Sequence, residues 1–190
     1  MGRKGESNRQ RIVEAADRLF YRRGYNQTSF QDISDETGIP RGNFYYYFKT
    51  KDDILDAVVD ARIAELESWL KHCESETTDP RERVLLFISI IDEKQADTLQ
   101  SGCPVGTLNS ELAKDTPELQ QKATRAFNLF RDWLKQQFTA LGLSDVDNLS
   151  MDLLARMQGI ALIACAFKDR DFIQRSHNEL REWVLHRTSS

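Results

Sequence analysis

The stretch from Thr28 to Leu55, which decides the fold, reads TSFQDISDETGIPRGNFYYYFKTKDDIL. Thr28 and Gln31 have the spacing of a capping box, in which each side chain binds a backbone N–H at the start of a helix. Gly38 predicts the end of this short helix. Pro40 suits the first turn of the next helix, because proline lacks an N–H and holds a helical φ. Two short helices joined by a glycine-containing turn predict a helix-turn-helix.

Helical spacing of apolar residues continues on both sides of this stretch. Upstream, residues 12–20 place apolar side chains on one helical face, and Gly24 predicts the end of that helix. Downstream, a long helix is expected from Asp52 to about Cys73, with acidic residues in its first turn. Further helices are expected over residues 84–91, up to Ala113, over 117–138, 149–167 and 171–186. The sequence therefore predicts an all-α chain of about nine helices.

The charge is unevenly distributed along the 190 residues, whose formal net charge is −4. Residues 1–51 contain ten Lys/Arg and six Asp/Glu, which gives +4, whereas the other 139 residues contain 16 and 24, which gives −8. A basic end on an acidic chain is typical of a protein that binds nucleic acid through that end. We expect a DNA-binding head over residues 1–50 and a body for ligand binding and dimerisation over residues 51–190.

The second helix of the helix-turn-helix is expected to lie in the major groove of DNA. There the guanidinium of Arg41 could donate two hydrogen bonds to guanine, and the side-chain amide of Asn43 could pair with adenine. Backbone N–H groups at the start of a helix and lysine ammonium groups both bind DNA phosphates. The residues expected to contact DNA are Thr28, Ser29, Arg41, Gly42, Asn43, Tyr45, Tyr46, Lys49 and Lys51. Phe44, Tyr47 and Phe48 are expected in the core instead.

Residues 7 to 55 resemble the DNA-binding domain of TetR-family regulators without a gap. The resemblance rests on Gly24-Tyr25, Thr28-Ser29, Gly38-Ile39, Gly42 and the run from Tyr45 to Lys51. It implies a homodimeric transcriptional regulator that binds palindromic operator DNA, in most cases as a repressor, and that a small molecule or a cysteine modification releases. One departure is Pro40, where the family often has a serine that caps the recognition helix and contacts a phosphate.

The resemblance also implies that two C-terminal helices form a four-helix bundle with a second copy. The run from Gly159 to Phe167 is apolar on all sides, which predicts a helix covered on several sides. A partner copy would supply this cover, although a monomer whose own core buries both helices remains the alternative. The residues expected at the dimer interface are Ile160, Ala161, Ala164, Phe167, Leu180, Trp183 and Val184.

An effector pocket is expected inside the body, as the family places it. Candidates for its lining are Trp69, Phe87, Ile91, Cys103, Leu108, Phe127, Phe130 and Met157. Each of these apolar residues is equally explained as ordinary core. The effector itself is not identified by composition, because most pockets are apolar with a few polar groups.

Cys103 lies in the segment Gly-Cys-Pro-Val-Gly, and a Gly-Cys-x-x-Gly segment resembles one branch of the family in which some members sense electrophiles or oxidants. A helix start lowers the pKa of a thiol, so a reactive sensor is one interpretation, and a small residue in a tight turn is the other. Cys73 beside His72 is a poor metal site, since adjacent helical residues point in different directions. Cys165 is expected in the core.

Other classes of protein fit the sequence less well. The histidines are too few and the cysteines too widely spaced for an expected zinc site, and no G-x-S-x-G nucleophile turn occurs, so we expect no metal, no cofactor and no enzymatic activity. The charge-free run between Arg156 and Lys168 is too short for a membrane span. A cytoplasmic regulator is therefore expected. An activator of the same fold remains open, and a small helical enzyme or an interaction module is a weaker alternative.

Overall fold

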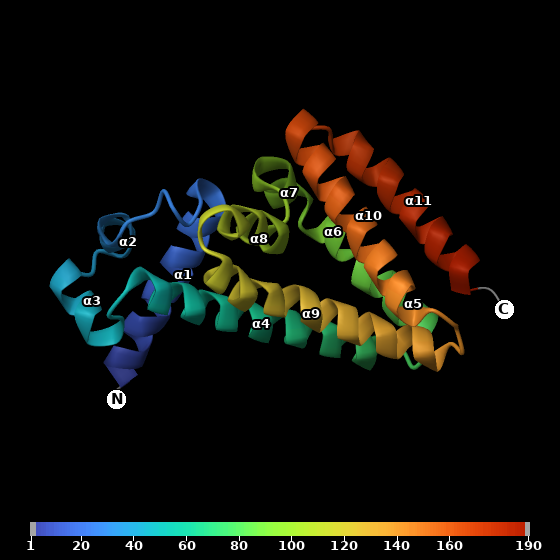
Figure 1. Ribbon diagram of the computed structural model, residues 1–190, viewed down its shortest axis with the longest axis horizontal. Helices are drawn as coiled ribbons and strands as arrows, with labels where there is room; N and C mark the ends of the chain where they lie inside the picture. Colours follow the sequence, from blue (N-terminus) through green and yellow to red (C-terminus); the bar gives the residue numbers. More distant parts are fainter. Residues whose placement is uncertain (1–2, 189–190) are drawn as a thin grey trace. The chain divides into compact units, whose positions relative to one another are not determined.

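The computed structural model describes residues 3–188, except for the side chains of residues 3–6, Arg41 and Asp115. The described residues form helices without strands (Figure 1). The helices are α1 (Arg3–Arg23), α2 (Phe30–Thr37), α3 (Arg41–Tyr47), α4 (Lys51–Glu76), α5 (Pro80–Ile88), α6 (Ile90–Glu93), α7 (Gln95–Ser101), α8 (Pro104–Asp115), α9 (Pro117–Ala140), α10 (Val146–Phe167) and α11 (Arg170–Thr188).

The all-α prediction is confirmed. Single residues, Ser89 and Lys94, separate α5, α6 and α7, so these three segments together take the place of one interrupted helix. Counted in that way, the eleven described segments correspond to the nine helices that were expected. The helix of residues 95–101 was not predicted, because its sequence QADTLQS has no apolar periodicity.

The chain divides into two compact units. Unit 1 contains the residues up to Ala64 together with Thr107–Ala126, and unit 2 contains Glu65–Gly106 together with the residues from Phe127 onward. The long helices α4, α8 and α9 each contribute residues to both units. The boundary between residues 50 and 51 that the sequence suggested therefore remains a prediction about function and does not coincide with the packing units.

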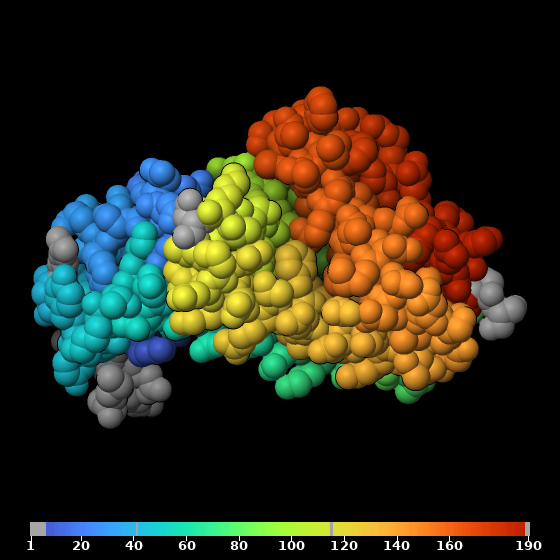
Figure 2. Space-filling view, viewed as in Figure 1, coloured from blue at the N-terminus to red at the C-terminus, as the bar shows by residue number. Residues whose placement is uncertain are grey.

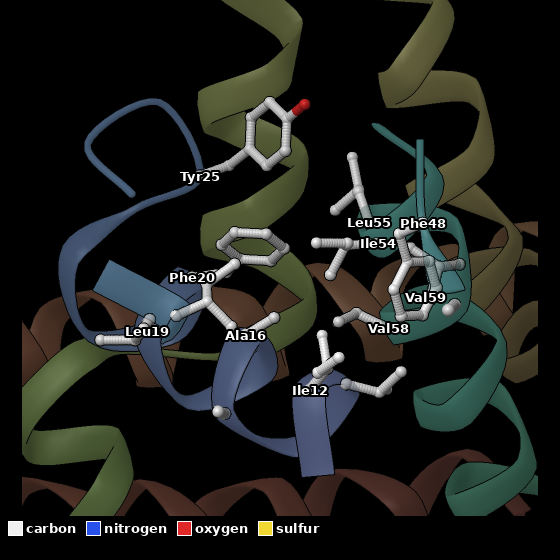
Figure 3. Packing of buried hydrophobic residues seen from close by; sticks show 14 of the residues in the cluster. Ile12, Ala16, Leu19, Phe20, Tyr25, Phe48, Ile54, Leu55, Val58 and Val59 are labelled. Atoms are coloured by element: carbon white, nitrogen blue, oxygen red, sulfur yellow. The ribbon is translucent and has the colours of Figure 1, made fainter. Parts of the chain in front are cut away.

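The core of unit 1 lies between α1 and the first turns of α4. Ile12, Ala16 and Phe20 of α1 face Ile54 and Val58 of α4, as Figure 3 shows. Burial of these apolar side chains stabilises the unit, because each Å² of apolar surface removed from water contributes roughly 25 cal/mol. Residues of α8 and α9 belong to the same cluster: Leu108, Leu112, Leu119 and Ala123.

In unit 2, α10 and α11 run side by side, and Figure 1 shows both helices in orange and red. α10 also packs against α7, and α11 packs against α5 and α6. The buried side of α10 includes Leu153 and Ala164, and Ile173 and Val184 are buried on α11. These contacts use one side of each helix, so each helix also has an exposed side.

Candidate DNA-binding site

α3 buries one face and exposes the other. Phe44 is fully buried and Phe48, just after the helix, is also buried, whereas Tyr46 is 69% exposed. The burial of Phe44 within the helix and of Phe48 directly after it holds α3 on the core. The backbone of Arg41 belongs to α3, but its side chain lies outside the described residues. Exposed candidates for DNA contact on α3 are Gly42, Asn43, Tyr45 and Tyr46.

The two exposed tyrosines are held differently. The ring of Tyr45 stacks on Phe30 of α2, with ring centroids 5.8 Å apart and an angle of 19° between the planes. The ring of Tyr46 meets Tyr47 edge to face at 5.0 Å. The Phe30 contact ties the surface of α3 to α2, so the two helices of the motif present one continuous face.

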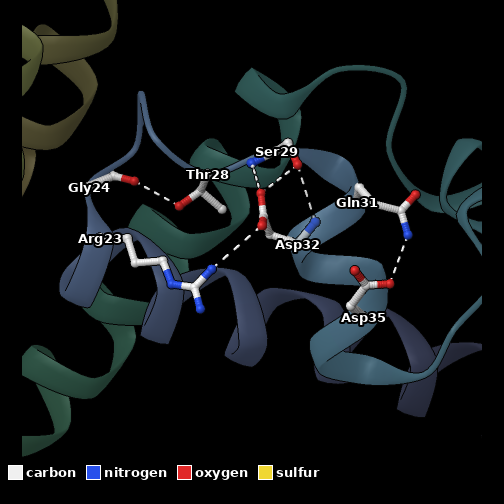
Figure 4. A network of polar contacts seen from close by, with 7 residues as sticks. All are labelled: Arg23, Gly24, Thr28, Ser29, Gln31, Asp32 and Asp35. Carbon is white, nitrogen blue, oxygen red and sulfur yellow. Dashed lines mark hydrogen bonds and ion pairs between the residues drawn. The ribbon is translucent and has the colours of Figure 1, made fainter.

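A capping box begins α2, but it is displaced by one residue from the predicted box. Ser29 is the cap: its Oγ accepts from the N–H of Asp32 at 3.2 Å, and the Asp32 carboxylate accepts from the N–H of Ser29 at 2.7 Å (Figure 4). The Ser29 hydroxyl also donates to the Asp32 carboxylate at 2.5 Å, and this bond, together with the bond from the Ser29 N–H, lowers the pKa of Asp32. The predicted partner Gln31 instead donates to Asp35 at 2.8 Å. The Thr28–Gln31 prediction was therefore wrong, because Ser29 and Asp32 have the same spacing with a stronger acceptor.

Thr28 and Lys51 are engaged inside unit 1. Thr28 is buried, and its hydroxyl donates to the carbonyl of Gly24 at 2.7 Å. The Lys51 ammonium donates to the carbonyl of Tyr25 at 2.9 Å and lies 4.1 Å from the centre of the Tyr25 ring. Burial lowers the pKa of Lys51. These two groups hold the loop before α2, whereas Ser29 and Lys49 are exposed.

The surface beside the start of α2 is hollowed. A hollow of about 550 Å³ is lined by Asn26, Gln27, Thr28, Ser29, Phe30, Gln31 and Lys51. Lys49 lies at the other end of the motif, where its ammonium donates to the carbonyl of Tyr45 at 2.6 Å. The exposed polar surface of the motif therefore extends from the start of α2 to the end of α3.

α1 fixes the position of α2. The Arg11 guanidinium donates to the carbonyl of Thr37 at 2.7 Å, which satisfies a carbonyl in the last turn of α2. Arg18 and Glu36 form an exposed ion pair at 3.3 Å, and such pairs contribute little on their own. The buried contacts of α1 and the Arg11 bond therefore help to set the orientation of the motif.

The candidate effector residues do not all lie in one unit. Phe87 packs against Phe130 with ring centroids 5.2 Å apart and against Trp133 at 5.5 Å. Ile91 and Met157 are also buried, Phe127 is half-buried, and the indole Nε1 of Trp69 is buried without a hydrogen-bond partner. Leu108 is the exception, because it belongs to the buried cluster of unit 1. The effector residues thus remain candidates, and Leu108 is more simply explained as core.

The three cysteines have different surroundings. Cys103 directly precedes α8, is half-buried, and has its Sγ 3.4 Å from Gln158 Nε2. A Cβ at Gly106 would lie 2.2 Å from Gln158 Oε1, so a larger residue there would displace the end of the Gln158 side chain. Cys73 is fully buried, and burial raises the pKa of its thiol to about 11. Cys165 is half-buried. The described residues contain no group of three or more His, Cys, Asp or Glu that could hold a metal ion.

Two family models match the chain. Residues 12–58, which include the whole helix-turn-helix, match the bacterial regulatory proteins of the TetR family. Residues 80–179, more than half of the 190 residues, match the C-terminal domain of LmrA/YxaF-like transcriptional regulators. The chain belongs to the TetR family. This TetR-family protein is a helix-turn-helix regulator of transcription and not an enzyme, as predicted.

Known relatives agree with this assignment. A helix-turn-helix regulator from the lacX 3′ region of Lactococcus lactis subsp. lactis is 28% identical over 183 residues, 92% of each chain. The regulator YxaF of Bacillus subtilis (strain 168) is 32% identical over 136 residues, 70% of this chain and 69% of YxaF. A crystal structure of a TetR-family regulator from Agrobacterium tumefaciens has a TM-score of 0.83 at 24% identity and covers 94% of this chain and 97% of that one. The structural likeness shows the TetR fold.

In this TetR-family chain, the apolar residues of α10 fall on two faces. The buried face includes the predicted interface residues Ile160, Ala161 and Ala164, and Leu180 and Val184 of α11 are buried as well. These five side chains pack inside their own chain, and their place at an interface stays a prediction. Phe167 is 75% exposed, and half-buried Trp183 lies under the guanidinium of Arg156 at 4.9 Å. Figure 2 shows α10 and α11, orange to red, as neighbours at the surface.

The exposed face of α10 was not singled out by sequence. Its seven apolar members are Met151, Ala155, Gly159, Leu162, Ile163, Ala166 and Phe167, and the charged residues Asp152 and Arg156 are exposed beside them. The signal was present as a second helical stripe, offset from the buried stripe by about half a turn. We name these seven residues the α10 stripe.

α10 is also the one helix among the described residues that is long and apolar enough to cross a membrane, judged by length and composition. The charge-free run considered from the sequence was shorter, because it stopped at Arg156. Residues 80–179 include α10, so the family match assigns this helix to the C-terminal regulator domain.

Proposed function

We propose that this TetR-family regulator is a cytoplasmic homodimeric repressor that binds a palindromic operator and is released by a small molecule or by modification of Cys103. The observation that carries the proposal is the α10 stripe. Leu162 and Phe167 are 68% and 75% exposed, which is unusual for large apolar side chains on an ordered helix. A second copy that places its own stripe against this one would bury both.

DNA binding by two copies explains the exposed face of the helix-turn-helix. Asn43 offers an amide to a base, and Tyr45 and Tyr46 offer hydroxyl groups to phosphates. A two-fold dimer would present two such faces to half-sites one helical turn apart, or a multiple of about 34–36 Å. The operator is therefore expected to be a palindrome. The side-chain role of Arg41 toward guanine remains part of this proposal.

Release requires a state that binds the effector better than the DNA-bound state does. α4 is one unbroken helix of 26 residues, with its first part in unit 1 and its later part in unit 2. A rigid helix of this length is suited to transmit a change in the body to the DNA-binding motif. Cys103 directly precedes α8 and is half-buried, which supports it as the site of modification over the fully buried Cys73.

A selection on random duplexes tests the proposal. Purified full-length protein would be used with and without a thiol-reactive electrophile, beside a Cys103→Ser variant. A palindromic winner that is lost on treatment, but is kept by the variant, supports a cysteine-sensing dimeric repressor. A palindrome bound equally in all conditions supports the dimer and redirects the search to reversible ligands. No enriched sequence would contradict the proposal.

A further inference from the structure

The turn between α1 and α2 is held by a residue far away in the sequence. The Glu111 carboxylate, on α8, accepts from the N–H of Tyr25 at 2.9 Å and from the N–H of Asn26 at 2.8 Å. Each carboxylate oxygen binds a different amide, and hydrogen bonds to a charged acceptor are stronger than neutral ones. Glu111 therefore fixes two consecutive backbone groups at once.

α4 holds the same turn from its own side. Lys51 donates to the carbonyl of Tyr25 at 2.9 Å, and the Tyr25 hydroxyl donates to Asp52. Burial and the Asp52 contact raise the pKa of Tyr25, so its hydroxyl stays protonated as a donor. Tyr25 is thus bound by α8 through its N–H and by α4 through its carbonyl and hydroxyl.

Gly24 shows how closely Glu111 approaches. Its φ is +93°, and a Cβ added there would lie 3.0 Å from both carboxylate oxygens of Glu111. Any larger residue would strain the backbone and displace the carboxylate. The glycine and the glutamate therefore fit each other.

The held turn is connected directly to the helix-turn-helix. Thr28 donates its hydroxyl to the carbonyl of Gly24 at 2.7 Å and its N–H to the carbonyl of Tyr25 at 3.2 Å. Ser29, the next residue, caps α2. Leu108 and Leu112 of α8 are buried in the core cluster of unit 1, so Glu111 is attached to a packed helix.

We propose that Glu111 is a positioning residue for DNA binding: it fixes the turn before α2 and thereby the orientation of α2 and α3, without contacting DNA. The proposal rests on DNA binding by the family and not on the dimer or the effector. It also means that the functional DNA-binding unit includes α8, about 60 residues beyond the end of α3 in the sequence.

The experiment compares full-length Glu111→Ala and Glu111→Gln with Glu118→Gln, an exposed residue of unit 1 whose replacement changes the charge equally. Affinity is measured for the best duplex from the random selection, and amide exchange is measured at Tyr25 and Asn26. We expect Glu111→Ala to bind the duplex about ten-fold or more weakly and to exchange both amides at least about ten-fold faster, as the loss of hydrogen bonds to a charged group implies.

Glu111→Gln keeps the shape and one acceptor oxygen, so it should lie between wild type and Glu111→Ala, and it remains informative if the alanine variant does not fold. The sign of the effect is diagnostic. Removal of a negative charge by itself favours binding to phosphates. Weaker binding by Glu111→Gln beside equal or tighter binding by Glu118→Gln therefore supports positioning.

Either of two results would overturn the inference: unchanged exchange at Tyr25 and Asn26 in the Glu111 variants, or faster exchange with wild-type affinity for the duplex. A selection that enriches no duplex would contradict the proposed repressor and, with it, a role of Glu111 in DNA binding, whereas faster amide exchange would still show that Glu111 holds the turn. Gly24→Ala provides an independent check, because its cost should be smaller in a Glu111→Ala background, where the close contact is absent.

Discussion

The protein exposes large apolar or aromatic side chains on two helices, α3 and α10, and the two surfaces differ in chemistry. The exposed aromatic residues of α3, Tyr45 and Tyr46, end in hydroxyl groups, whereas Leu162 and Phe167 of α10 have no polar atoms. A ring with a polar tip is suited to a wet, charged surface such as DNA. An apolar stripe is suited to another apolar surface.

The two surfaces are also supported differently. α3 has seven residues and is held by Phe44 below it and by Phe30, which stacks on Tyr45. α10 has 22 residues and packs on α7 and α11 with its buried face. A short helix needs tertiary contacts to exist, and a long one presents a second face once its first is buried. The exposed face of α3 is therefore the outer side of a short helix held by its neighbours, whereas the exposed face of α10 is the second side of a long helix.

The largest expected effect comes from a charge placed in the α10 stripe. Phe167→Asp or Leu162→Asp should raise the dissociation constant of the dimer at least about 100-fold, because burial of an unpaired carboxylate costs several kcal/mol. Sedimentation velocity measures the shift to monomer, and operator affinity should fall with it. Since both side chains are exposed in one chain, the melting temperature of the monomer should change little.

Gln174→Asp is the matched control for this charge, because Gln174 is exposed on the polar side of α11. It should leave the association state unchanged. A dimer that survives both stripe variants would show that the stripe has another role.

The next effect in size is on α3. Asn43→Ala and Tyr46→Ala should weaken operator binding by about 1–3 kcal/mol each, the value of a good base or phosphate contact. The dimer should persist in both variants, so they would separate the role of α3 in DNA binding from the role of α10 in dimerisation. Tyr46→Phe removes only the hydroxyl, and wild-type affinity for that variant in a fluorescence anisotropy titration would exclude a phosphate bond from Tyr46.

A smaller effect is expected at the start of α2. Ser29→Ala removes the side-chain cap and should lower the free energy of unfolding by about 0.5–2 kcal/mol. Gln31→Ala serves as the control, since Gln31 was the capping partner expected from sequence but binds Asp35 instead. Equal losses for the two variants in chemical denaturation would argue against the Ser29–Asp32 box.

The smallest effect is a pH dependence of the two helix starts. Hydrogen bonds with Ser29 lower the pKa of Asp32, and those with the Thr50 and Lys49 amides lower the pKa of Asp53. Groups with a lowered folded-state pKa stabilise the fold above their unfolded value of about 4, and this contribution is lost as the pH falls through the folded value. The difference in stability between wild type and Asp32→Asn should therefore shrink below about pH 4, and a constant difference from pH 6 to pH 3 would contradict this.

Much of the fold was predictable because it depends on local signals. The start near Pro117, the stop at Gly142 and the break at Gly38 all agree with the helix ends that are observed. The family resemblance rested on the same residues. The capping box was predicted one residue too early. The pairs Thr28–Gln31 and Ser29–Asp32 have the same spacing, and only the observed hydrogen bonds distinguish them.

The candidate DNA-binding residues were predictable in part. The exposure of Asn43, Tyr45 and Tyr46 fits the expectation, whereas Lys51 and Thr28 hold the loop before α2. A lysine beside a helix start has the same sequence pattern whether it faces phosphate or a carbonyl. Glu111 carried no sequence signal at all, because its partners are the backbone amides of residues 25 and 26, 85 or 86 positions away.

The sequence by itself determined the helical class, the helix-turn-helix and the TetR family, because turns, caps and apolar periodicity depend on neighbours within a few residues. Only the tertiary structure decided which face of α10 is buried and which residue of α8 holds the first turn of the motif. An apolar helix such as Val146–Phe167 has two stripes of similar hydrophobicity, and periodicity does not choose between them. The choice depends on which stripe the neighbouring helices cover, and that depends on contacts between residues far apart in the chain.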